Sequence, residues 1–124
     1  MQPALPKKIL VVDDDEAQAH LIATFLRKHG FHVVTANDPL AALQLLEHSP
    51  VDLVITDLMM PHVDGIDFTE RLHQLPNLAQ VPVILISAWP SEQLSDKGMR
   101  RGVALTLSKP VHLAKLLDLV GFAT

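Results

Sequence analysis

The chain has 124 residues, of which 48% are hydrophobic and 19% are charged, and its formal net charge is −4. This size and composition suit one folded domain and argue against disorder. Because the chain has no cysteine, disulfides, thiolate-bound zinc, iron–sulfur clusters and thiol catalysis are excluded. The acidic balance gives no general attraction to nucleic acid or anionic lipid, and every apolar run is too short for a signal peptide or a membrane span. We therefore expect a cytoplasmic protein without direct nucleic-acid or membrane contacts.

The first part of the chain alternates two kinds of apolar pattern. Residues 9–12 are continuously apolar and rich in β-branched side chains, which predicts a strand buried on both faces. A helix follows, with acidic residues before it and Gly30 after it. Its apolar face is predicted to consist of Ala17, Leu21, Ile22 and Phe25. Residues 31–35 predict a second strand.

A second helix follows, capped by Asn37 or Asp38 and with Pro39 in its first turn. Its apolar face is predicted to consist of Leu40, Leu43 and Leu46. Residues 51–56 predict the third strand, which ends at Asp57, and residues 58–63 predict a loop.

The remaining elements continue the alternation. Residues 66–75 predict a helix that stops near Pro76, and residues 81–86 predict the fourth strand. Residues 91–101 form a weak helix pattern, with few apolar side chains and an internal glycine. Residues 103–107 predict the fifth strand. The last helix carries apolar residues at positions i, i+3, i+4 and i+7, namely Leu113, Leu116, Leu117 and Val120.

Five such strand–helix units predict an α/β fold, an open doubly wound parallel sheet with helices on both faces and right-handed crossovers. An eight-stranded barrel would need about twice the length. In open sheets of this kind, ligands bind beyond the carboxyl ends of the strands. The residues at the strand ends are therefore the candidates for function.

Polar side chains follow the predicted strands in a consistent way. Asp13 and Asp14 follow the first strand, Asp57 the third and Ser87 the fourth, and Lys109 comes just after the fifth. Carboxylates gathered at one edge repel each other unless a cation lies between them, and Mg²⁺ binds one or two carboxylates together with water and phosphate oxygens. Together with an ammonium and a hydroxyl group, they predict a magnesium-dependent phosphoryl site in which a carboxylate is the nucleophile.

Four short motifs in order, each at a predicted strand end, resemble the receiver domain of bacterial response regulators. They are Val11-Val12-Asp13-Asp14, the run from Asp57 through Met60-Pro61 to Asp64-Gly65, Ile86-Ser87-Ala88 and Ser108-Lys109-Pro110. The resemblance covers nearly the whole chain. It implies a flavodoxin-like (βα)5 sandwich with strand order 2-1-3-4-5, and a phosphoacceptor signalling domain rather than an enzyme that acts on other substrates.

The same resemblance implies a role for each residue of the site. Asp57 would accept the phosphoryl group from a histidine kinase or a histidine phosphotransfer protein. Mg²⁺ would be bound by the carboxylates of Asp14 and Asp57 and the backbone carbonyl of Met59, with indirect help from Asp13. The remaining roles would fall to Lys109, which would contact a phosphoryl oxygen, and to Ser87, which would swing toward the phosphoryl group and report its presence. The Lys109–Pro110 bond is expected to be cis.

Two positions depart from the family pattern. The family usually has an aromatic switch residue three positions before the lysine, where this chain has Thr106. Trp89 lies two residues after Ser87, where a large ring could narrow access to Asp57 or assume part of the missing switch role. These departures motivate an alternative, a pseudo-receiver scaffold that binds partners without phosphorylation. A phosphatase with an aspartyl-phosphate scheme is a third hypothesis, opposed by the lack of room for a cap domain.

The strand count assigns the core to about residues 7–121. We therefore expect residues 1–124 to form a single receiver domain without an output domain. Its signal would then pass to a downstream protein or a second copy of the chain. The expected contact surface is the face formed by the fourth helix (residues 91–101), the fifth strand (residues 103–107) and the last helix. The polar pattern of residues 91–101 fits an element that rearranges.

Overall fold

The computed structural model describes residues 7–61, 63–88 and 102–124. Its elements in chain order are β1 (Lys8–Val12), α1 (Glu16–Lys28), β2 (His32–Ala36), α2 (Pro39–His48), β3 (Leu53–Asp57), α3 (Gly65–His73), β4 (Val83–Ser87), β5 (Leu105–Ser108) and α5 (Leu113–Ala123). The predicted helix 91–101 and the predicted role of Trp89 fall outside the described residues. In the described ranges, no helix has the length and apolar character needed to cross a membrane.

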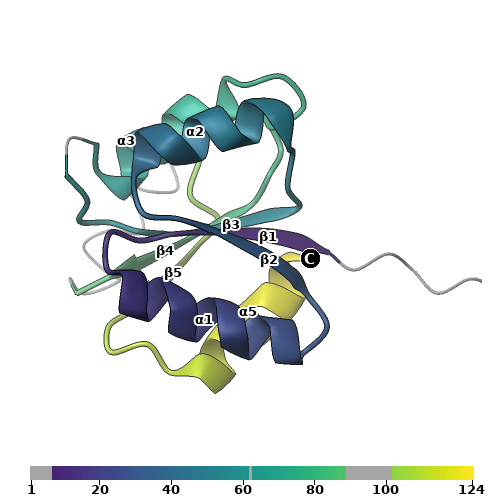
Figure 1. The fold of residues 1–124 in the computed structure, drawn as a ribbon, viewed down its shortest axis with the longest axis vertical. Coiled ribbons are helices and arrows are strands. Elements are labelled where there is room, and N and C mark those ends of the chain that lie inside the picture. The colour runs from purple at the N-terminus through teal and green to yellow at the C-terminus, as the bar shows by residue number, and fades with distance from the viewer. Residues whose placement is uncertain (1–6, 62, 89–101) are drawn as a thin grey trace, which may run out of the picture.

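The five strands form one parallel sheet in the order β2-β1-β3-β4-β5. Helices α1 and α5 cover one face of this sheet, and α2 and α3 cover the other (Figure 1). This arrangement confirms the predicted flavodoxin-like doubly wound fold. The order reverses between β1 and β3, so the ends of these two neighbouring strands meet at the switch point where such folds bind ligands.

The central strands supply both hydrophobic layers, because successive side chains of a strand point to opposite faces. In β1, Ile9 and Val11 pack into the layer under α1 and α5, whereas Leu10 and Val12 pack into the layer under α2 and α3. All residues of β3 and β4 are buried. The continuous apolar runs in the sequence thus correspond to strands covered on both faces, as predicted.

The buried faces of the first two helices differ from the predicted ones. In α1 the buried residues are Ala19, Ile22, Ala23 and Leu26, whereas Leu21 is 57% exposed. In α2 the buried residues are Pro39, Ala42 and Leu46, whereas Leu40 is 47% exposed. In both helices small alanines face the sheet and allow a close approach, and a leucine predicted to be buried lies outside the contact. The predicted face of α5 agrees with the structure at Leu116 and Val120, which are fully buried.

Aspartates begin three of the helices. The side chain of Asp15 accepts hydrogen bonds from the backbone N–H groups at the start of α1, Asp38 does so for α2 and Asp64 for α3. Each cap satisfies a backbone donor that has no partner within its helix. Asp38, rather than Asn37, is therefore the cap of α2.

The boundaries of β3 and β4 lie slightly later in the chain than predicted. β3 begins at Leu53 and includes Asp57, and β4 begins at Val83 and includes Ser87. Val51 and Val81 are buried but lie outside the ladders. The difference arises because hydrophobicity reports burial, whereas a strand continues for as long as its backbone is paired. Asp57 and Ser87 are thus held by the sheet itself.

β2 forms one edge of the sheet. The His32 N–H donates to the Lys7 carbonyl, and the Ala36 carbonyl accepts from the Asp13 N–H, so these two residues face β1. Because alternate residues of a strand bond to opposite sides, the carbonyl of Val33 points away from β1. The guanidinium of Arg27 in α1 donates a hydrogen bond of 2.8 Å to this Val33 carbonyl. A side chain of α1 therefore covers part of the open edge.

Candidate functional site

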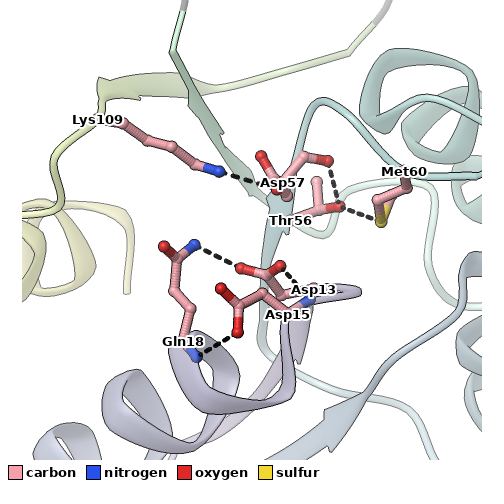
Figure 2. A network of polar contacts seen from close by, with 7 residues as sticks. All are labelled: Asp13, Asp15, Gln18, Thr56, Asp57, Met60 and Lys109. Carbon is pink, nitrogen blue, oxygen red and sulfur yellow. Dashed lines mark hydrogen bonds and ion pairs between the residues drawn. The ribbon is translucent and has the colours of Figure 1, made fainter.

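Asp57, the last residue of β3, lies at the centre of the candidate site. Its carboxylate is 5% exposed, and its Oδ2 accepts a hydrogen bond of 3.1 Å from the Lys109 ammonium (Figure 2). Its Oδ1 is buried and has no hydrogen-bond partner among the described residues. A buried carboxylate oxygen without a donor is costly, so this atom marks a place where a further positively charged or donating group fits.

The acidic residues at the end of β1 lie beside Asp57. The backbone N–H of Asp13 donates to the Ala36 carbonyl at 3.0 Å, which holds the Asp13 side chain at the carboxyl edge of the sheet. Asp13 is 2% exposed, whereas Asp14 is exposed. Carboxylate oxygens of Asp13, Asp14 and Asp57, one from each residue, lie within 4.8 Å of one another. The structure thus brings together the three carboxylates that the sequence singled out.

The environment raises the pKa of Asp13 above its ordinary value. Burial is the largest cause, and the nearby charge of Asp57 acts in the same direction. The backbone N–H of Asp15, the Gln18 amide and the Lys109 ammonium oppose the rise without cancelling it. The negative charge of Asp13 is therefore unfavourable in the folded protein.

A divalent cation with oxygen ligands would relieve this unfavourable charge. The donor set consists of three clustered carboxylates, and one oxygen of Asp57 is buried without a donor. Hard cations such as Mg²⁺ prefer carboxylate and carbonyl oxygens, and the chain has no cysteine thiolate that would favour a softer metal. The residues present therefore fit a divalent metal ion.

Ser87 and Lys109 close the other side of the site, at the ends of β4 and β5. The backbone N–H of Lys109 donates to the Ser87 carbonyl at 2.8 Å, which places the two residues next to each other. Ser87 is 2% exposed and the Lys109 side chain is 32% exposed. The Lys109–Pro110 bond is cis, as the sequence resemblance implied.

The loop after Asp57 is fixed by a close approach at Gly65. A Cβ atom at this position would lie 2.5 Å from the carbonyl oxygen of Asp57 and 2.6 Å from Leu85 Cδ1. The Gly65 N–H donates to the Leu58 carbonyl at 2.8 Å. Only glycine fits here, because α3 begins directly against the end of β3. Met59, whose carbonyl is a predicted metal ligand, has an exposed side chain in this loop.

Met60 packs toward the base of the same loop. The buried hydroxyl of Thr56 donates to the Asp57 carbonyl at 3.1 Å and lies 3.8 Å from the Met60 sulfur (Figure 2). These contacts attach the loop to the strand on which Asp57 lies.

Two features of the site were not predicted from the sequence. Gln18 Nε2 donates to Asp13 Oδ2, a contact from the first turn of α1 to the end of β1. The close approach at Gly65 was interpreted only as a turn. Both depend on contacts between elements, and the sole sequence signal for Gln18 is its position in the first turn of a helix that starts just after the acidic pair.

The comparison with protein families agrees with this geometry. The model of the response regulator receiver domain matches residues 9–121. The chain belongs to this family. It is therefore a receiver domain of two-component signalling, a signalling domain rather than a classical enzyme, and receiver domains of response regulators partner with histidine kinases.

Relatives of the receiver domain occur alone and within longer proteins. It is 34% identical over 120 residues to an uncharacterized 14.6 kDa protein of Leptolyngbya boryana, covering 97% of this chain and 92% of the relative. It is 39% identical over 110 residues to the transcriptional regulatory protein CpxR of Escherichia coli, covering 89% of this chain and 46% of CpxR. It is 32% identical over 116 residues to the E. coli signal transduction histidine-protein kinase BarA, covering 94% of this chain but 13% of BarA.

Solved structures show the same fold. The receiver domain of the Francisella response regulator 1452 superposes with a TM-score of 0.86 at 32% identity, covering 94% of this chain and 95% of that one. The receiver domain of the Pseudomonas aeruginosa sensor histidine kinase PA1611 superposes with a TM-score of 0.83 at 25% identity, covering 94% and 96%. The PA1611 structure has a magnesium ion coordinated in its active site cleft.

Proposed function

We propose that this receiver domain accepts a phosphoryl group on Asp57 in the presence of Mg²⁺ and passes the signal on by altered protein binding. The observation that carries the proposal is the state of the Asp57 carboxylate. One of its oxygens is held by Lys109, and the other is buried without a described donor beside two further carboxylates. A carboxylate that has one oxygen without a hydrogen bond can bind a cation and act as a nucleophile.

The phosphoryl donor in this proposal is a phosphohistidine of a histidine kinase or of a histidine phosphotransfer protein. An Asp57 oxygen attacks the phosphorus atom, and the new P–O bond forms as the P–N bond breaks. The imidazole leaves with the electron pair of that bond and takes up a proton. Attack of water on the acyl phosphate later returns the carboxylate and releases inorganic phosphate.

Lys109 and Ser87 would act on the transferred group. The Lys109 ammonium already lies 3.1 Å from Asp57, so it is placed to bind a phosphoryl oxygen and to offset its charge. Ser87 lies at the end of the neighbouring strand, where its hydroxyl would contact the phosphoryl group and report its presence. The backbone bond between the two residues would couple their positions.

The acidic cluster would hold the metal ion through the carboxylates of Asp14 and Asp57 and the Met59 carbonyl, with Asp13 acting indirectly. When bound, Mg²⁺ supplies positive charge that offsets the charge on the phosphoryl oxygens. The metal-bound cleft of the PA1611 receiver supports this assignment by analogy.

The output would pass through the face that includes β5 and α5 to a downstream protein or a second copy of the chain. Thr106, half-buried in β5 opposite Leu85, stands at the family's usual aromatic switch position. A threonine has no ring to rotate, so the response to phosphorylation in this chain would depend on backbone and hydroxyl contacts.

Incubation of the full chain with Mg²⁺ and a small phosphodonor such as acetyl phosphate tests the proposal by intact mass. We expect one phosphoryl adduct in the wild type and in Asp118→Asn, a matched control on the exposed side of α5, and none in Asp57→Asn. No adduct with acetyl phosphate or with a cognate kinase would instead favour the pseudo-receiver scaffold.

A further inference from the structure

Gln18 connects the start of α1 to the acidic cluster. Its side-chain amide donates to Asp13 Oδ2, while the backbone N–H of Asp15 donates to Asp13 Oδ1 at 2.9 Å (Figure 2). Both oxygens of the Asp13 carboxylate therefore already have a donor from the protein.

Gln18 is itself held in place by the helix cap. Its backbone N–H donates to Asp15 Oδ1 at 3.2 Å, and the same oxygen accepts from the Ala17 N–H at 3.0 Å. The Gln18 side chain thus extends from the capped first turn of α1. Its contact with Asp13 is a restraint between two elements rather than a chance approach of two surface groups.

The three carboxylates of the cluster differ in their availability. Asp57 Oδ1 has no donor among the described residues, and Asp14 is exposed. Asp13 is 2% exposed and each of its oxygens already accepts a hydrogen bond, so a cation that bound it directly would compete with these donors in a place that water reaches poorly, and would weaken or displace one of them. Since a hydrogen bond to a charged group is worth roughly a factor of ten or more in an equilibrium constant, this loss is a substantial penalty.

We propose that Gln18 is a specificity-determining residue of the metal site. Its hydrogen bond to Asp13 keeps that carboxylate from contacting the cation directly, so the carboxylates that do so are those of Asp14 and Asp57. Mg²⁺ is satisfied by one or two carboxylates and retains water, whereas Ca²⁺ takes six to eight oxygens and gains from additional carboxylates. Gln18 therefore favours Mg²⁺ over Ca²⁺. The inference rests on the proposed metal-dependent function of Asp57.

Calorimetric titration of the metal-free full chain with Mg²⁺ and, separately, with Ca²⁺ tests the inference. In Gln18→Met, which keeps the length but lacks the donor, we expect the ratio of Ca²⁺ affinity to Mg²⁺ affinity to rise roughly tenfold. Gln18→Asn, which is polar but too short to reach Asp13, should show the same shift. Gln44→Met, the matched substitution on the exposed side of α2, should leave the ratio at the wild-type value.

A second measurement follows the Gln18 side-chain amide by NMR without any phosphodonor. We expect its resonances in the wild type to stay in place when Mg²⁺ is added, because the bond to Asp13 persists. An unchanged affinity ratio in both Gln18 variants, or an amide released by Mg²⁺, would overturn the inference while phosphorylation of Asp57 stood. A wild type that binds no Mg²⁺ would contradict both this inference and the proposed function.

Discussion

The apolar layers and the carboxyl edge of the sheet bury their residues for opposite reasons. The layers contain closely packed apolar side chains, such as Leu26 on one face and Phe68 on the other, and both are fully buried. The edge buries Asp13, whose charge the rest of the fold does not fully compensate, and Asp57, one of whose oxygens has no donor among the described residues. The layers stabilise the domain through many similar contacts. The buried charge at the edge lowers that stability, but the same residues form a cluster of groups that can bind a cation or a phosphoryl group.

The largest effect on stability should come from the layers. We expect Leu26→Ala to lower the free energy of unfolding by about 2–5 kcal/mol, because it removes a fully buried side chain and leaves a cavity. Phosphoryl uptake per folded molecule should remain unchanged. Denaturant unfolding measures the stability, and intact mass measures the phosphoryl uptake. A lower uptake per folded molecule in Leu26→Ala would contradict the view that the layers affect stability but not the chemistry of the edge.

A smaller loss is expected where the two regions meet. Gly65→Ala places a methyl group against the Asp57 carbonyl and Leu85, so we expect a loss of about 1–3 kcal/mol from overpacking. Because the displaced carbonyl belongs to Asp57, the rate of phosphoryl uptake should fall as well. Gly121→Ala is the control, since a Cβ there meets no atom within 4 Å. Equal uptake rates in the two variants would contradict this account.

At the edge, a substitution should change stability in the opposite direction. The folded state raises the pKa of Asp13 and so binds its proton more tightly than the unfolded chain does. The ionised Asp13 carboxylate therefore lowers the stability of the fold, and this loss is fully present above the raised pKa. The loss disappears as the pH falls through the raised pKa toward the ordinary pKa of an aspartate. We expect metal-free Asp13→Asn to have a higher Tm than the wild type at neutral pH.

This advantage should shrink as the solution is acidified, and Mg²⁺ should raise the Tm of the wild type more than that of Asp13→Asn. Thermal unfolding at several pH values, with and without Mg²⁺, measures both effects. A lower Tm for metal-free Asp13→Asn at neutral pH would show that the hydrogen bonds of Asp13 outweigh its repulsion.

The smallest effect is expected at Leu21. This side chain is 57% exposed on the helix that also carries Leu26, so Leu21→Ala should change stability by no more than about 0.5 kcal/mol. A loss as large as that of Leu26→Ala would place Leu21 in the layer, contrary to the structure. The pair thus compares buried and exposed leucines within one helix.

Much of the fold and of the site could be predicted because both depend on local sequence. Continuous apolar runs marked the strands, and polar residues directly after them marked Asp13, Asp57 and Ser87. Parallel strands bring such ends to one edge, so the grouping followed once the alternation was recognised. The functional roles of these residues remain predictions that the experiments above address.

The features that could not be predicted from the sequence depend on contacts between elements. Periodicity alone placed Leu21 on the buried face of α1, because a leucine is more hydrophobic than the alanines that face the sheet. The close approach at Gly65 and the reach of Gln18 to Asp13 depend on how α3 and α1 meet the strand ends. No spacing within a single segment contains that information.

The bond from Arg27 to the Val33 carbonyl also has a consequence for solubility. An open strand edge with unpaired backbone groups is a template for pairing with another chain, and cationic side chains on the edge are one protection against it. Arg27 occupies an acceptor that an incoming strand would need. The guanidinium therefore protects against aggregation at β2, and concentrated solutions of a chain without it would be prone to edge-to-edge association.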